Sequence, residues 1–346
     1  MGYKNKSYRK DMKQQMHDRF DKMGAYGESK KEALATDSDR NKLHSYGTYQ
    51  TYRKHSGYFI DYVREKHPEC TTLKHAEKYV PEWVEHLREK CRNDGSKHSA
   101  WTVTTYSQAV IKLYGMTPES KYYPDKPQRH RQDITRSRGD AVRDRHFSEK
   151  NNHEFVQFCK GTGCRRNIME KLEGRDLALR ADMEKAYDAL KDRTDLTPAQ
   201  DRERTILKDA LVNFPDQKAF LHHRTDKGGR DRYSPIVGPE KDVERIIERM
   251  RETAPNEKVW QHVPGNADIH SYRGMYASRV YKQYARPIDK IPYKEAEKGR
   301  RYQPEVYCCR KDEKGKKLDK VAMEKASKAL GHNRLEIVAN NYLRGI

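Results

Sequence analysis

The feature that most constrains the fold of this chain is a set of apolar and aromatic side chains that recur at helical spacing between residues 46 and 115. Three successive stretches show this spacing, and they end before Pro68, near Asn93 to Gly95, and at Gly115. The apolar positions are Tyr49, Tyr52, Phe59, Tyr62 and Val63 in the first stretch, Leu73, Ala76, Val80, Trp83, Val84 and Leu87 in the second, and Ala100, Val103, Tyr106, Val110, Leu113 and Tyr114 in the third. Amphipathic helices joined by short connections bury their apolar faces together. The sequence therefore predicts a compact helical bundle over 41–116.

A second region, from 146 to 346, combines helical patterns with one pair of extended segments. The extended runs 219–225 and 233–237 flank Gly228 and Gly229, which is a signal for an antiparallel hairpin. Helical patterns occupy 153–159, 168–172, 182–190, 243–250, 274–284 and the segment from 321 to the end. We therefore expect a mainly α fold with a small antiparallel β-sheet in this region.

Two segments lack such periodicity. Residues 117–145 contain three prolines, and between Lys121 and Arg145 eight basic residues face four aspartates, so we expect a basic linker. Residues 1–40 are highly charged, with possible helical stretches at Lys4–Met23 and Ser29–Ala35, and we expect them to form an N-terminal extension. The predicted order is an extension (1–40), a helical domain (41–116), a linker (117–145) and a second domain (146–346).

The charge of the chain restricts its partners. The 72 lysines and arginines exceed the 52 aspartates and glutamates and give a formal net charge of +20. These residues occur along the whole chain, so a long polyanion such as nucleic acid is favoured over a small anionic metabolite. No run of about 18 apolar residues and no signal peptide is visible, and the six cysteines lack zinc-binding spacing. We expect a cytoplasmic protein with reduced thiols, no membrane partner and no metal.

Four segments of the second region carry arginine, lysine, histidine and tyrosine in a defined order. They are TGCRRNIMEKLEGRDL (162–177), DKGGRDRYSPI (226–236), DIHSYRGMYASRVY (268–281) and ALGHNRLEIVANNYL (329–343). Each one alone is weak evidence in so basic a chain. Together they resemble the four signature segments of the tyrosine recombinase (phage integrase) family, over roughly 146–346. The bundle of 41–116 is similar in architecture to the core-binding domain of that family.

The resemblance implies a nucleophile and a reaction. Tyr342, ten positions after His332, would attack a DNA phosphodiester and leave a 3′-phosphotyrosine and a free 5′ hydroxyl. The covalent bond keeps the energy of the phosphodiester, so rejoining needs neither ATP nor metal, and no cofactor is expected. The usual spacing in the family is nine. We expect the loop, or the first turn before the helix of the nucleophile, to absorb the extra residue.

The resemblance also assigns roles to five side chains around the scissile phosphate. Arg165 and Arg273 would hold the phosphate through planar, permanently charged contacts. Lys227 would protonate the leaving 5′ oxygen. His270 would assist proton transfer from the tyrosine, and His332 would donate a hydrogen bond to the phosphate.

The first segment departs from the family at one position and leaves one choice open. The family usually has a glutamate three places after the first arginine, and this chain has Ile168. Arg166 is adjacent to Arg165, and the choice of Arg165 rests on Leu172 and Asp176. These lie seven and eleven positions later, where the family has an apolar residue and an aspartate.

The resemblance implies a site-specific DNA recombinase that integrates or excises a mobile element. Its expected partners are double-stranded DNA recombination sites, three further copies of itself in a homotetramer on DNA, and accessory DNA-bending proteins. Three alternatives remain. The first is a site-independent enzyme that nicks and reseals DNA, like a type IB topoisomerase. The others are a catalytically inactive DNA-binding regulator on the same fold and an unrelated basic RNA-binding protein.

Overall fold

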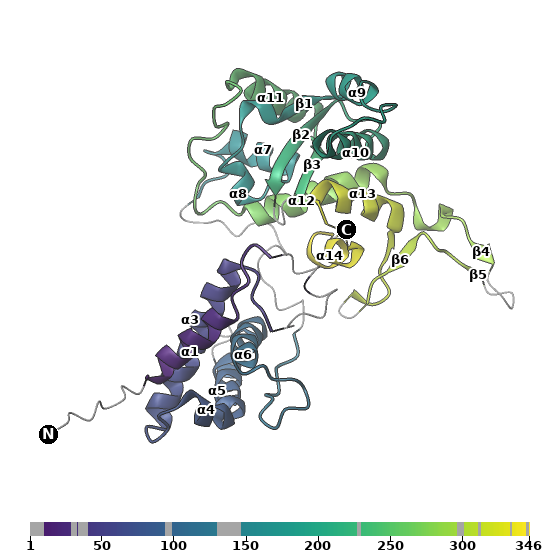
Figure 1. Ribbon diagram of the computed structural model, residues 1–346. Helices are drawn as coiled ribbons and strands as arrows, with labels where there is room; N and C mark the ends of the chain where they lie inside the picture. Colours follow the sequence, from purple (N-terminus) through teal and green to yellow (C-terminus); the bar gives the residue numbers. More distant parts are fainter. Residues whose placement is uncertain are drawn as a thin grey trace. The chain divides into compact units, whose positions relative to one another are not determined.

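A computed structural model of the protein describes residues 10–28, 33, 41–93, 99–129, 147–226, 230–295, 301–310, 313–332, 334–343 and 346. The chain divides into two compact units, residues 1–133 and 134–346. It is mainly helical with small antiparallel sheets (Figure 1). The predicted linker is described only as far as residue 129, and Lys227 lies outside the described residues.

The first unit is a helical bundle, which confirms the prediction from residue spacing. Its elements are α1 (Met12–Lys22), α3 (Tyr46–Lys66), α4 (Leu73–Ala76), a 3-10 turn (Glu77–Tyr79), α5 (Val80–Asn93) and α6 (Ala100–Tyr114). The Phe59 ring lies 5.3 Å from that of Trp83 and 6.2 Å from that of Tyr114, centroid to centroid, in edge-on contacts that join α3, α5 and α6. Gly115 ends α6 in the left-handed conformation, with φ of +67°.

Helix α1 lies within the helical stretch Lys4–Met23 of the predicted N-terminal extension, and it packs into the core of the bundle. Asp11 caps the helix by accepting from the backbone of Gln14, whose side chain accepts in turn from the Asp11 amide. One face of the helix carries Met12, Met16 and Phe20, which are buried in the same core as the helices of 46–114. These three apolar residues recur at spacing four, which places them on one helical face.

The second unit is built around a three-stranded antiparallel sheet of order β1-β2-β3. The strands are β1 (Leu177–Leu179), β2 (Ala219–Asp226) and β3 (Arg230–Pro235), and pairing of the last two confirms the predicted hairpin. The helices are α7 (His153–Thr162), α8 (Arg166–Met169), α9 (Arg180–Asp188), α10 (Pro198–Asn213), α11 (Glu240–Glu252), α12 (Ile269–Tyr284), α13 (Lys320–Leu330) and α14 (Leu335–Asn341). Helix α12 packs along α7 and α13, and α10 and α13 both contact β3 (Figure 1).

Several elements of this unit were not predicted. Helix α10 buries only Leu207 and Ala210, so its sequence shows little periodicity. Two small sheets lie between α12 and α13: β4 (Lys294–Glu295) pairs with β5 (Arg301–Tyr302), and β6 (Val306–Cys308) pairs with β7 (Lys317–Asp319). These strands are two or three residues long, too short for an alternating pattern to emerge. In the described part of the chain, no helix has the length and apolarity needed to cross a membrane.

Candidate active site

Five of the six side chains singled out in the sequence lie in described parts of the second unit, and the structure brings them together. They come from the loop after α7, the first turn of α12, the loop after α13 and the end of α14. The residues are Arg165, His270, Arg273, His332 and Tyr342. The sixth, Lys227, follows β2 in the sequence and lies outside the described residues.

Arg273 lies at the centre of the cluster. The residue is 2% exposed, and its guanidinium ties two other segments to α12. Its Nη1 donates to the carbonyl oxygen of Gly163, and its Nη2 donates to that of Leu330 at 2.5 Å. Burial lowers the pKa of Arg273 from its usual value, and the charge of Arg165 acts in the same direction. Its Nε is buried and finds no hydrogen-bond acceptor among the described residues.

The turn at Gly163 makes this contact possible. Gly163 ends α7 in the left-handed conformation, with φ of +60°. A Cβ at this position would lie 2.3 Å from the Tyr276 ring, so only glycine fits. The carbonyl of Gly163 therefore reaches Arg273, while the next residues carry Arg165 into the cluster.

Tyr342 lies directly after the last residue of α14 and is 9% exposed. Its hydroxyl oxygen is 3.4 Å from Nε2 of His332. The ring centroid lies 5.5 Å from that of His270 and 5.8 Å from the guanidinium carbon of Arg273. The tyrosine is thus surrounded by the three motif side chains that could exchange a proton with it or stabilise its negative charge.

His270 is kept in its neutral form by its surroundings. Partial burial lowers the pKa of His270, and the nearby charges of Arg273 and Arg165 lower it further, against the opposing effect of Asp268. A neutral imidazole can accept a proton, so His270 is suited to act as a base toward Tyr342. The residue keeps an exposed face.

The structure distinguishes the two adjacent arginines of the first segment. Arg166 donates to the carbonyls of Pro264, Gly265 and Ala267, at 3.0, 3.1 and 3.0 Å, and so holds the loop before α12. Arg165 instead lies beside Arg273 and forms an ion pair with Asp226. The choice of Arg165 for the cluster, made from spacing, therefore agrees with its place in the structure.

Three further side chains join the cluster that the sequence did not single out. Asp226 is 2% exposed and forms ion pairs with Arg165 and with Arg232, the latter at 2.6 Å. His223, 1% exposed, pairs across the sheet with Arg232. Burial lowers the pKa of His223 well below its usual value. The only sequence signal for this group was its place on either side of the Gly-Gly turn.

The cluster therefore combines three guanidiniums, one buried carboxylate, histidine side chains of which His270 is neutral, and a tyrosine hydroxyl. Arg165, with its side chain 23% exposed, is more accessible to solvent than Arg273, the other motif arginine. Such a set suits binding of a phosphodiester anion and attack on it by the tyrosine oxygen, because the guanidiniums stabilise the charge that develops on phosphate.

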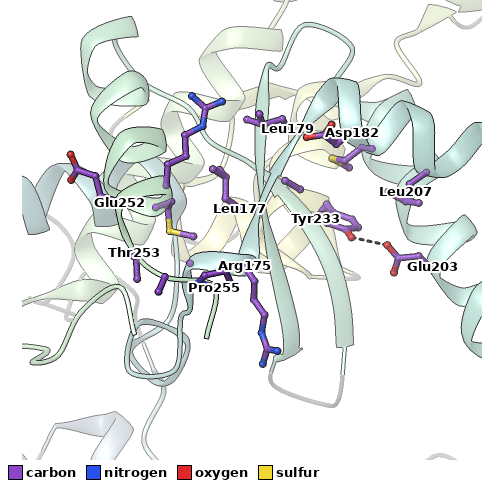
Figure 2. A pocket seen from close by; sticks show the side chains of 17 residues that line it. Arg175, Leu177, Leu179, Asp182, Glu203, Leu207, Tyr233, Glu252, Thr253 and Pro255 are labelled. Atoms are coloured by element: carbon purple, nitrogen blue, oxygen red, sulfur yellow. Dashed lines mark hydrogen bonds between the residues drawn. The ribbon is translucent and has the colours of Figure 1, made fainter. Parts of the chain in front are cut away.

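A separate cavity of about 600 Å³ lies elsewhere on this unit. It is lined by residues of β1, α9, α10, β3 and the end of α11, and none of the five described site residues contributes to it (Figure 2). Tyr233 and Glu203 lie side by side in the lining of this cavity, where the Tyr233 phenol donates a 2.6 Å hydrogen bond to the Glu203 carboxylate (Figure 2).

Neither the scan of known protein-family models nor the search of curated proteins finds a match to this chain.

Proposed function

We propose that this protein is a site-specific DNA recombinase, of the integrase type, that cuts and rejoins DNA through a 3′-phosphotyrosine. The observation that carries the proposal is the environment of Tyr342. Its hydroxyl lies 3.4 Å from His332, its ring is 5.5 Å from the ring of His270, and Arg273 lies 5.8 Å from the ring centre. Four ordered sequence segments supply this one cluster, which supports their resemblance to the tyrosine recombinases.

Phosphate binding is the role proposed for the arginines. A guanidinium has five N–H donors, and Arg273 uses one donor on each of its Nη atoms for main-chain carbonyls. The remaining donors, together with those of Arg165, can bind the non-bridging oxygens of a scissile phosphate. Both groups stay charged throughout the reaction, so the stabilisation they give requires no proton transfer.

In the proposed chemical step, each proton transfer is assigned to one side chain. His270, neutral because its pKa is lowered, accepts the proton of the Tyr342 hydroxyl. The tyrosine oxygen attacks phosphorus, the bond from phosphorus to the 5′ oxygen breaks, and that oxygen takes a proton, for which Lys227 is the proposed donor. His332 hydrogen-bonds the phosphate. Rejoining reverses these steps with a different 5′ hydroxyl, so no external energy source is consumed.

The first unit is proposed as a DNA-binding domain that positions the duplex. A hollow of about 450 Å³ on its surface is lined by Arg53, Lys54 and Tyr58, among others, and by Lys13, which forms an ion pair with Asp61 at 2.6 Å. Basic side chains of this kind bind phosphates without reading sequence. Because exchange of strands needs four cleavages, the proposed working form is a homotetramer on DNA in the cytoplasm, at the nucleoid. Accessory DNA-bending proteins are proposed to assist it.

The proposal is tested with a pool of duplexes of randomised sequence, each nicked a few nucleotides downstream of a central position. Cleavage there releases a short fragment, so the covalent complex cannot reseal and accumulates. We expect the wild-type chain to form a protein–DNA adduct that resists denaturation, and Tyr342→Phe to form none. Tyr307→Phe is the matched control, because it removes a hydroxyl from a tyrosine outside the cluster, and it should form the adduct normally.

Sequencing the captured duplexes separates the alternatives. Enrichment of one sequence supports a site-specific recombinase. An adduct without sequence preference, with relaxation of any supercoiled plasmid, would show a nicking and resealing enzyme instead. Absence of adduct with high-affinity binding to one sequence would point to an inactive regulator, and preference for RNA over the pool would show an RNA-binding protein.

A further inference from the structure

Asp226 stands apart from the proposed catalytic groups, since a carboxylate repels phosphate rather than binding it. The residue ends β2 and is 2% exposed. One of its oxygens, Oδ2, accepts from Nη1 of Arg165 and also from Nη1 of Arg232 at 2.6 Å. Such a carboxylate, next to a proposed phosphate site and shared by two arginines, requires an explanation.

We propose that Asp226 is a positioning residue that orients Arg165 for phosphate binding, with Arg232 as its anchor. The inference rests on the proposed function, since it concerns the same site. Arg165 is the partner that remains accessible, with its side chain 23% exposed, whereas that of Arg232 is 12% exposed. The carboxylate therefore joins a less exposed arginine on one side to a more exposed arginine on the other.

Arg232 is fixed by contacts on several sides. Its Nε donates to Ser234 Oγ at 3.2 Å, and that hydroxyl donates to the carbonyl of Ala329 at 2.7 Å. Gly331, with φ of +68°, lies so close that a Cβ there would be 2.8 Å from the guanidinium carbon of Arg232. The glycine that precedes His332 is thus required by the arginine that holds Asp226.

Charge balance gives a second reason for the carboxylate. Arg165 and Arg232 each lower the pKa of Arg273, which shows that the three guanidiniums repel one another. Like charges placed together away from water are costly unless an opposite charge is present. Asp226 reduces the net charge of the three arginines and removes the repulsion that would turn Arg165 outward.

The carboxylate comes from β2 because the neighbouring position cannot supply it. Ile168, where the tyrosine recombinases usually have a glutamate, is 6% exposed and packs in an apolar core with Met169 and Leu172. No side chain of α8 can therefore offer Arg165 a negative charge from that position. A hairpin aspartate that reaches the same arginine provides one by a different route.

The test is Asp226→Asn, which keeps the shape of the side chain and removes its charge. The probe is the duplex recovered from the nicked pool with the wild-type chain. At saturating DNA, the rate constant of adduct formation should fall by about 10- to 100-fold, because Arg165 loses its orientation. The dissociation constant for the same duplex should stay equal or decrease, because a negative charge beside the phosphate has been removed. Misfolding would weaken both binding and cleavage.

Two further variants complete the experiment. Asp226→Glu restores the charge on a longer side chain, and should recover part of the lost rate. Asp319→Asn is the matched control: Asp319 is another buried carboxylate, bound by Arg286 Nε at 2.8 Å. It begins α13, about 16 Å from the end of that helix at 1.5 Å per residue. It should lower stability and leave the cleavage rate unchanged.

The outcomes separate this inference from the proposed function. Wild-type adduct with an unchanged rate in Asp226→Asn overturns the inference alone. A slower Asp226→Asn that also binds DNA more weakly, or an Asp319→Asn with the same rate loss, overturns it in favour of a structural role. If the wild-type chain forms no adduct, the proposed function is wrong, and the inference about Asp226 is then wrong as well.

Discussion

The cores of the two units differ in what they bury. Among the described residues, the first unit buries two polar side chains, Ser56 and Ser107. The second unit buries ten, including Asp226, Arg273 and Asp319. Buried charge costs folding free energy unless it is paired, whereas an apolar core of rings in edge-on contact stabilises the fold directly. The first unit is therefore organised for stability, and the second keeps charges where the proposed chemistry needs them.

The largest effect that sharpens this comparison is expected from Arg273→Gln. The glutamine amide can still donate to the carbonyl of Gly163 or of Leu330, so the second unit should stay folded. Loss of the positive charge, which the neighbouring arginines repel, should offset part of the free energy lost with the other hydrogen bond. The rate of adduct formation should fall by about 100- to 1,000-fold, because a preorganised charge on the phosphate is removed. Single-turnover cleavage measures the rate of adduct formation, and near-ultraviolet circular dichroism shows whether the second unit stays folded.

The counterpart in the first unit is Trp83→Ala. Removing this ring should lower the free energy of unfolding of the first unit by about 3–5 kcal/mol and weaken DNA binding, because its core loses a large buried side chain. If Arg273→Gln instead unfolded the second unit as completely as Trp83→Ala unfolds the first, the buried arginine would serve structure, and the contrast between the cores would fail.

A smaller effect is expected from two glycines that end helices in the same conformation. Gly115 and Gly331 have φ of +67° and +68°, so an alanine at either should cost about 1–2 kcal/mol of stability. At Gly115 the nearest atom to an added Cβ is 3.5 Å away, in the side chain of Asn41. At Gly331 it is 2.8 Å away, in Arg232. Only Gly331→Ala should therefore slow cleavage, by about 10-fold.

Thermal unfolding and single-turnover cleavage of both alanine variants make this test. Equal loss of stability with a rate effect confined to Gly331→Ala would support the link from the glycine through Arg232 to the site. Equal rates for both variants would show that Arg232 moves aside without consequence.

The smallest effect concerns pH. The pKa of His223 lies well below its usual value in the folded state because the ring is buried, so the unfolded state binds the proton more readily. Below about pH 6.5 the free energy of unfolding of the second unit should therefore fall, by up to about 1.4 kcal/mol per pH unit, until the folded pKa is reached. His17, His55 and His86 in the first unit also have lowered pKa values but are less buried, so that unit should respond less.

Denaturant titrations between pH 7 and pH 5 measure this difference, since Trp260 reports on the second unit and Trp83 and Trp101 report on the first. His223→Asn should flatten the pH dependence of the second unit. A slope unchanged by that substitution would place the acid sensitivity on other groups.

The sequence predicted the elements whose burial follows a regular spacing. The helices of 46–114 and the hairpin around Gly228 and Gly229 follow from one apolar face and from turn chemistry. The gathering of Arg165, Arg273 and Tyr342 was expected only because four segments together resembled a known family. Each segment alone would have been read as surface charge.

The features that escaped prediction depend on contacts between distant segments. Asp226 meets Arg232 only through the pairing of β2 with β3, whose register shifts between His223 and Asp226. A shift of this kind changes which side chains share a face and leaves no trace in the order of residues. Helix α1 lies within a predicted helical stretch, but its packing into the bundle was not predicted, because its three buried residues contribute little to the average composition of the segment.

Tyr342 lies directly after the final residue of α14, and this place determines how its main chain is held. The amides of Tyr342 and Leu343 both donate to one carbonyl, that of Val338, at 3.0 and 3.1 Å. The main chain at Tyr342 is therefore held by the last turn of α14, and the position of the phenol depends on that turn.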